Sequence, residues 1–362
     1  MSFAPDITEQ LARARADLRM GVPIALTGRQ PALLLAAETL SAQRLADLLA
    51  LGGAPVLAIT ARRAETLKAR PYDGDLARVT LPEDATPGWV QSIADPADDL
   101  RAPMKGPLAC SRDGAADAHR VALQIAKSAR LLPAVLVLEH ADVAELARHH
   151  GLTTLDLDAI TPSLGAVSPL HPVVNARLPM EVSEAGRLHI FRPEDGAEEH
   201  YAIEIGRPDR RKPVLARLHS ACFTGDLMGS LKCDCGPQLR AALAQMGAEG
   251  EGVLLYLNQE GRGIGLANKM RAYSLQDQGF DTVEANHRLG FEDDERDFRL
   301  GAHILTSMGF SSVRLLTNNP RKVDMMNDSG VTVSERVPLA VGENRHNKAY
   351  LATKAAKSGH LL

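Results

Sequence analysis

Residues 219–239, HSACFTGDLMGSLKCDCGPQL, contain three of the four cysteines in the chain. Cys222 is followed, after ten residues, by Cys233 and Cys235. Three thiolates suit Zn²⁺, and a catalytic zinc ion typically has three protein ligands and a bound water whose pKa falls towards neutrality. The spacing also fits a closed structural zinc site in which His219 is the fourth ligand.

Two further segments resemble places where a phosphate binds. Residues 258–266, NQEGRGIGL, follow a predicted strand and open a predicted helix, and residues 316–322, LTNNPRK, do the same. Glycines let backbone N–H groups approach an anion, and a helix N-terminus adds positive potential. A plain tight turn explains the first segment equally well, so it is a weak signal when taken alone.

Composition and charge exclude several classes of protein. The chain has 362 residues, of which 45% are hydrophobic and 24% charged, as expected of a globular protein of about two domains. A net charge of −4 and a pI of about 6.3 exclude a general nucleic-acid binder. No window approaches the roughly 18 apolar residues of a membrane span. The first ten residues lack a secretory signal, so we expect a cytoplasmic protein.

The periodicity predicts two domains of a mixed α/β or α+β class. In the first half, apolar stretches at 22–26, 33–37, 55–59 and 134–138 alternate with helical patterns at 41–51 and 119–131. Residues 161–179 are rich in Pro, Gly and Ser, and the domain boundary is placed there, between 1–170 and 171–362. Strands are predicted in the second half at 186–192, 198–205, 214–220, 252–259 and 312–317. Helices are predicted there at 266–279, 297–309 and 319–330.

An acidic run, GFEDDERDF at residues 290–298, carries Asp294 two residues before Arg296. Most such runs are solvated loops. The alternative is a carboxylate that serves as a base beside a guanidinium that meets phosphate.

Four segments together resemble the signature segments of GTP cyclohydrolase II. They are RLHSACFTGDLMGSLKCDCGPQL at 217–239, QEGRGIGL at 259–266, RAYSLQDQGFDTVEANHRLGFEDDERDF at 271–298 and LLTNNPRK at 315–322. The resemblance implies zinc-dependent hydrolysis of GTP to 2,5-diamino-6-(5-phosphoribosylamino)pyrimidin-4(3H)-one, formate and pyrophosphate, the first committed step of riboflavin synthesis. It implies one Zn²⁺ per subunit and Mg²⁺ with the GTP phosphates. We also expect a homodimer without nucleic-acid or membrane partners.

The resemblance also implies roles for individual residues. It places the zinc on Cys222, Cys233 and Cys235. It assigns Asp294 as proton acceptor, Arg296 as nucleophile and Tyr273 as a neighbour of the reacting imidazole ring. Because an arginine is a poor nucleophile at its usual pKa, a phosphate clamp is the rival role for Arg296. The residues assigned to the GTP pocket are Arg217, Leu218, His219, Ser220, Ala221, Gln238, Glu260, Gly261, Arg262, Thr282, Thr317 and Lys322.

The chain departs from the family at two places. Ala221 stands where the family often has glutamate, and Leu257-Asn258 stand where it often has His-Arg. These pocket departures keep two alternatives open: a non-catalytic GTP-binding zinc protein, and a sibling enzyme that opens another nucleotide ring.

The first half resembles, more faintly, 3,4-dihydroxy-2-butanone 4-phosphate synthase. That family binds Mg²⁺ through an acidic turn after its first strand, whereas residues 27–31 here are TGRQP, with no carboxylate. Its late Gly-His-Thr-Glu segment has no counterpart, and His119 is predicted on a helix surface. We therefore expect a degenerate, inactive domain.

Overall fold

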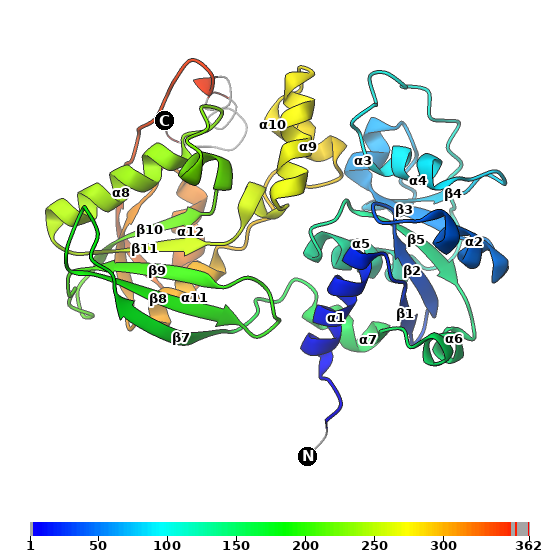
Figure 1. Ribbon diagram of the computed structural model, residues 1–362, viewed down its shortest axis with the longest axis horizontal. Coiled ribbons are helices and arrows are strands. Elements are labelled where there is room, and N and C mark those ends of the chain that lie inside the picture. The colour runs from blue at the N-terminus through cyan, green and yellow to red at the C-terminus, as the bar shows by residue number, and fades with distance from the viewer. Residues whose placement is uncertain (1–2, 349–351, 353–360, 362) are drawn as a thin grey trace. The chain divides into compact units, whose positions relative to one another are not determined.

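The computed structural model describes residues 3–348, 352 and 361, and the chain divides into two compact units (Figure 1). Unit 1 comprises Met1–Ala166 and Ala267–Glu295, and unit 2 comprises Val167–Leu266 and Arg296–Leu362. The division after Ala166 falls within the Pro-, Gly- and Ser-rich stretch 161–179. The sequence-based division assigned residues 267–295 to the second half, whereas the structure groups them with unit 1.

Unit 1 is built on a sheet with strand order β4-β3-β5-β2-β1-β6, in which only the β1–β6 pair is parallel. Its strands are β1 (Ile24–Thr27), β2 (Ala32–Ala36), β3 (Val56–Thr60), β4 (Leu76–Thr80), β5 (Ala134–Glu139) and β6 (Thr154–Asp156). Its helices are α1 (Ile7–Met20), α2 (Ala42–Ala50), α3 (Ala61–Thr66), α4 (Pro87–Ala94), α5 (Asp117–Ser128), α6 (Val143–His150), α7 (Leu157–Ile160), the 3-10 helix η1 (Thr161–Ser163), α9 (Leu266–Asp277) and α10 (Thr282–Arg288).

Unit 2 is built on a sheet with strand order β13-β12-β10-β11-β9-β8-β7. The strands are β7 (Leu170–Arg177), β8 (Gly186–Pro193), β9 (His200–Ile205), β10 (Val214–Ser220), β11 (Gly252–Leu257), β12 (Ser312–Leu316) and β13 (Thr332–Val337). The helices are the π-helix η2 (Phe223–Leu227), α8 (Cys235–Glu249), the 3-10 helix η3 (Glu260–Gly263), α11 (Arg299–Ser307) and α12 (Pro320–Asp328). The four strands from β13 to β11 are parallel, and β9, β8 and β7 continue the sheet antiparallel. The predicted mixed α/β class is confirmed.

Both faces of the unit 2 sheet are covered by helices (Figure 1). Val214, Ala216 and Leu218 share a core with α11 and α12. Leu215 belongs to a second core with Ala242 and Met246 of α8. The side chains of β10 therefore alternate between the two layers, as the period of a strand requires.

Strand β7 lies where the sequence predicted only a linker. It is one of the two edge strands of the sheet, and its register shifts between Pro172 and Val174. Proline is tolerated at such edges and bulges because its missing N–H removes no essential ladder bond. The Pro-rich composition of 161–179 therefore concealed a real strand. None of the helices in the described part of the chain combines the length and apolar character that a membrane span requires.

Candidate functional site

Three of the segments singled out in the sequence gather at the carboxyl ends of three neighbouring strands in unit 2. The sheet places β10 between β12 and β11, all parallel, and these strands end at Ser220, Leu257 and Leu316. In open α/β sheets, ligands bind outside the carboxyl ends of the parallel strands. The cysteine loop, the glycine-rich turn and the LTNNPRK turn each begin at one of these ends.

The three cysteines form a cluster with the dimensions of a zinc site. The sulfur atoms of Cys222, Cys233 and Cys235 lie within 4.8 Å of one another, and those of Cys222 and Cys233 are 3.7 Å apart. Sulfur ligands held about 2.3 Å from a tetrahedral zinc ion stand roughly 3.8 Å apart. The cluster therefore fits zinc before any ion is bound.

Gly225 makes room for this cluster. A Cβ atom at this position would lie 2.6 Å from the sulfur of Cys233 and 3.0 Å from that of Cys222. Any side chain would push the thiols apart, so glycine is required here for packing; its φ angle does not demand it.

The thiols are also poised chemically for a cation. Hydrogen bonding with Cys222, together with burial, raises the pKa of Cys233 to about 11. Bonding with both neighbours and burial raise the pKa of Cys235 well above its ordinary value. Crowded buried thiols resist becoming anions, and a divalent cation supplies the missing opposite charge.

Asp226, which the sequence analysis did not select, fixes the position of Cys222. Its Oδ2 accepts the N–H of Cys222 at 3.0 Å and the hydroxyl of Tyr256 at 3.0 Å. The same carboxylate is also hydrogen-bonded to Nε2 of His219, at 3.0 Å. The rings of His219 and Tyr256 stack with centroids 5.6 Å apart.

The closed Cys₃His alternative is not supported by this geometry. His219 is outside the group of metal-capable side chains found among the described residues, which consists of the three cysteines. Its Nε2 is engaged by Asp226, and burial lowers the pKa of His219, so the ring is neutral at pH 7. His219 therefore supports the cysteine loop without joining the cluster.

Arg217 is a buried cation on the α8 side of the sheet. It donates to the side-chain oxygen of Gln238 at 2.5 Å, and Gln238 in turn donates to Asp234 at 2.5 Å. Burial lowers the pKa of Arg217 to about 10, which leaves it charged at pH 7. Its Nε has no partner among the described residues, so one donor remains for a ligand.

The glycine-rich turn combines a carboxylate with strained backbone. Glu260 accepts the N–H of Phe223 at 2.6 Å and that of Gly261 at 3.0 Å, so it joins this turn to the cysteine loop. Arg262 adopts φ +62°, a left-handed conformation that costs energy for any residue but glycine. Such strain concentrates at functional sites. Where β10 and β11 end side by side, Ala221 donates its N–H to the carbonyl of Leu257 at 2.7 Å.

Two cations converge on one aromatic ring at the opposite face. The guanidinium of Arg296 and the ammonium of Lys322 lie 4.7 Å and 4.5 Å from the ring centre of Phe298. Arg296 also lies 3.4 Å from the hydroxyl of Ser220, and Lys322 donates to the carbonyl of Leu218 at 3.0 Å. This cation pair stands at the end of β10, where an anion is favoured.

Two residues that the sequence analysis did not select hold this arrangement. The side-chain amide of Gln259 bonds both the carbonyl and the N–H of Asp297, at 2.7 and 2.8 Å, and so fixes the segment that carries Arg296. Phe298 is 4% exposed and supplies the shared ring. Thr317, also buried, accepts the N–H of Asn319 at 3.0 Å, and Asn319 caps α12 by accepting the N–H of Arg321 at 3.0 Å.

The remaining predicted residues belong to unit 1. Tyr273 lies on α9 with the ammonium of Lys269 5.6 Å from its ring centre. Thr282 begins α10 and accepts a bond from Gln276 at 3.2 Å. Asp294 is exposed. The structure therefore divides the sequence-predicted site between the units.

The turn at residues 27–31 of unit 1 carries a positive charge among acids. Arg29 forms ion pairs with Asp117, at 3.1 Å, and with Asp158.

The prediction that His119 lies on a helix surface is wrong: it is 2% exposed, and its Nδ1 has no partner among the described residues. Burial lowers its pKa to about 4, because a charged imidazole would lose its hydration.

Comparison with known proteins gives a consistent result. Residues 171–338 match the family model of GTP cyclohydrolase II. A GTP cyclohydrolase-2 of Azospirillum brasilense is 44% identical over 360 residues, which cover 97% of this chain and 93% of that protein. One from Azotobacter vinelandii is 58% identical over 48% of this chain and 84% of its own length. One from Neisseria meningitidis is 55% identical over 53% of this chain and 97% of its own length.

Among solved structures, the chain is similar to a two-domain 3,4-dihydroxy-2-butanone 4-phosphate synthase from A. baumannii. The TM-score is 0.32 at 17% identity, over 91% of this chain and 99% of that one. A TM-score of this size does not establish a common fold.

Proposed function

The chain belongs to the GTP cyclohydrolase II family, and we propose that it hydrolyses GTP at the carboxyl ends of β10, β11 and β12, with a zinc ion held by Cys222, Cys233 and Cys235. The observation that supports this most directly is the 3.7 Å separation of the Cys222 and Cys233 sulfurs, which matches the ligand spacing of zinc. The products would be 2,5-diamino-6-(5-phosphoribosylamino)pyrimidin-4(3H)-one, formate and pyrophosphate, at the entry to riboflavin biosynthesis.

A zinc ion in this cluster would supply Lewis-acid activation of the water that opens the imidazole ring of guanine. The chain's own residues would position that ring. Arg217, with its unpaired Nε, and Gln238 lie on the α8 side of β10 and offer hydrogen-bonding groups to the base. Glu260, which joins the cysteine loop to the glycine-rich turn, would restrict where the base can sit.

The triphosphate would lie against the Arg296–Lys322 pair. Both cations rest on Phe298, so they are held in place before the substrate arrives, and Mg²⁺ would accompany the phosphates. This geometry supports the phosphate-clamp role for Arg296, because its guanidinium and the ammonium of Lys322 are both held against the ring of Phe298. From the family resemblance, Asp294 would be the proton acceptor and Tyr273 a neighbour of the ring.

Unit 1 would serve as a scaffold without catalysis of its own. The segment that carries Tyr273 and Thr282 is tied to the N-terminal half by Arg271, which pairs with Glu38 at 3.0 Å and with Asp95 at 3.1 Å. The synthase family presents carboxylates to Mg²⁺ at the turn after its first strand. Here the guanidinium of Arg29 forms ion pairs with the nearby carboxylates of Asp117 and Asp158 instead. The A. brasilense relative aligns along 97% of this chain, so the same two halves occur together there. We also propose a homodimer.

Two pairs of variants test the assignment. Cys233→Ser and Cys235→Ser should lose zinc and formate release together, because two thiolates hold the ion poorly. Asp294→Asn and Arg296→Ala should keep zinc and lose turnover. Stoichiometric zinc in the cysteine variants would refute the ligand assignment, and metal loss in the other pair would show that the acidic loop is structural. A chain that binds GTP and zinc but releases neither product would instead be a nucleotide sensor.

A further inference from the structure

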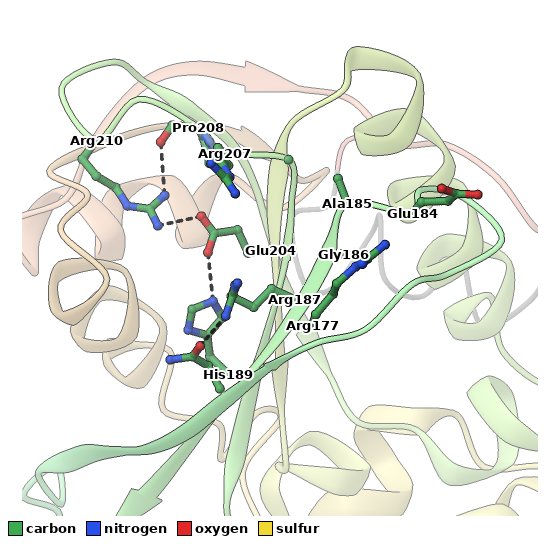
Figure 2. A pocket seen from close by; sticks show the side chains of 12 residues that line it. Arg177, Glu184, Ala185, Gly186, Arg187, His189, Glu204, Arg207, Pro208 and Arg210 are labelled. Carbon is green, nitrogen blue, oxygen red and sulfur yellow. Dashed lines mark hydrogen bonds and ion pairs between the residues drawn. The ribbon is translucent and has the colours of Figure 1, made fainter.

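A basic hollow of about 880 Å³ lies in unit 2, formed by β7, β8, β9 and the turn after β9 (Figure 2). It is distant from the cysteines. Gly186 pairs with Ile205, and Ile205 pairs with Gly252 at the start of β11. The cysteine loop adjoins Leu257 at the other end of β11, which is roughly 16 Å away at about 3.3 Å per residue.

Like charges face each other across the strands that line this hollow. Arg177 of β7 is paired directly with Arg187 of β8, and Arg187 is paired with Glu204 of β9. Like charges directly opposite on neighbouring strands destabilise a sheet. Both arginines are exposed, Arg177 on the edge strand β7 and Arg187 on the neighbouring β8, where nothing in the packing of the core requires a cation.

The buried acid nearby is already satisfied. One carboxylate oxygen of Glu204 accepts from Arg210 at 2.6 Å, and the other meets His189 at 2.8 Å, as Figure 2 shows. Arg187 bonds the side-chain oxygen of Asn175 at 2.6 Å. Glu204 is therefore not left to neutralise the outer arginines.

Two cations of the hollow remain available. Within the described part of the chain, neither Arg177 nor Arg207 has a side-chain hydrogen bond or ion pair. The lining holds four arginines and two glutamates, a formal charge of +2 with His189 neutral, on a chain whose net charge is −4. A local excess of this kind attracts anions.

We propose that this hollow binds a small phosphorylated anion, with the phosphate held between Arg177, Arg187 and Arg207. Guanidinium forks match phosphate oxygens in pairs, which favours phosphate over a single carboxylate. No Phe, Tyr or Trp lines the hollow, so a sugar phosphate or pyrophosphate fits better than a ligand held by base stacking. The volume is within the range of small-molecule sites.

Calorimetric titration of the full-length chain with inorganic pyrophosphate tests this site. Arg177→Gln/Arg207→Gln should weaken binding at this site by about tenfold for each arginine removed. The matched control is Arg211→Gln, which removes the same charge from a side chain that is 91% exposed, pairs with Asp209 and lies outside the hollow. It should bind as the wild type does.

Pyrophosphate could also bind at the proposed GTP site. An Arg296→Gln/Lys322→Gln variant distinguishes binding at that site from binding in the hollow. Binding that survives there and disappears in the Arg177→Gln/Arg207→Gln variant supports a second site, whether or not the GTP site takes pyrophosphate. Binding unchanged in Arg177→Gln/Arg207→Gln, or abolished entirely in Arg296→Gln/Lys322→Gln, would overturn the proposal. Equal melting temperatures of the variants would show that folding is intact.

Discussion

Replacing Gly225 by alanine should destroy the metal site with a single methyl group. The new Cβ would lie 2.6 Å from the Cys233 sulfur, 3.0 Å from the Cys222 sulfur and 3.1 Å from Cβ of Cys235. Non-bonded heavy atoms rest about 3.5–4.0 Å apart, so the Cys233 sulfur would have to retreat by about 1 Å. Metal–ligand distances tolerate only about 0.2 Å, so Cys233 could no longer share an ion with its neighbours.

The expected loss of zinc affinity is at least about 100-fold, beyond that of a substitution that only perturbs an outer contact. Overpacking should also cost the metal-free protein about 1–3 kcal/mol of unfolding free energy. Competition with a chromophoric chelator measures the affinity, and thermal unfolding measures the stability. Gly88→Ala is the matched control, since its nearest neighbour would be Thr86 Oγ1 at 3.8 Å. Wild-type zinc affinity in Gly225→Ala would refute the cluster geometry.

Three further outcomes follow. Asp226→Asn should weaken zinc binding by about 10- to 100-fold in the same titration, because the carboxylate that holds the Cys222 N–H loses its charge; unchanged affinity would contradict this. Burial alone would raise the pKa of Asp99, but hydrogen bonds and charge from Arg63 and Lys105 outweigh it and hold that pKa below its usual value. Asp99 therefore stabilises the fold above its ordinary pKa, and this stability is lost as the pH falls through the lowered pKa. Asp99→Asn should cost about 3–5 kcal/mol at pH 7 and flatten the acid limb of denaturant melts; an unaltered pH profile would count against the pairing. Finally, the full-length chain should form no dihydroxybutanone phosphate from ribulose 5-phosphate, and product detected by mass spectrometry would show that unit 1 is active despite Arg29.

The clustering of the three cysteines was predictable because it depends on local sequence. Cys233 and Cys235 are separated by one residue, and the loop from Cys222 is short and rich in glycine, so few backbone paths keep the thiols apart. The strands that end at this cluster were predictable for the same reason, since alternation and apolar runs are local patterns.

Residues that act through distant partners could not be found in this way. Gln259 matters because it bonds the backbone of Asp297, 38 positions away, and Phe298 because two cations from separate segments rest on it. His119 was predicted to be on the exposed face of its helix, but it lies on the face of α5 that is buried in unit 1.

The grouping of residues 267–295 with unit 1 has the same cause. Their sequence continues the family motifs of the second half, but Arg271 pairs with Glu38 and Asp95, and Arg62 pairs with Glu292. These contacts span more than 170 positions of the chain. Sequence periodicity carries no information about such partners.

Incubating the zinc-loaded full-length chain with GTP, while formate and pyrophosphate are measured together, is the decisive experiment. We expect one formate and one pyrophosphate for each GTP consumed, and neither from protein stripped of metal by a chelator. Zinc-loaded protein that binds GTP and releases no formate would contradict the proposed reaction.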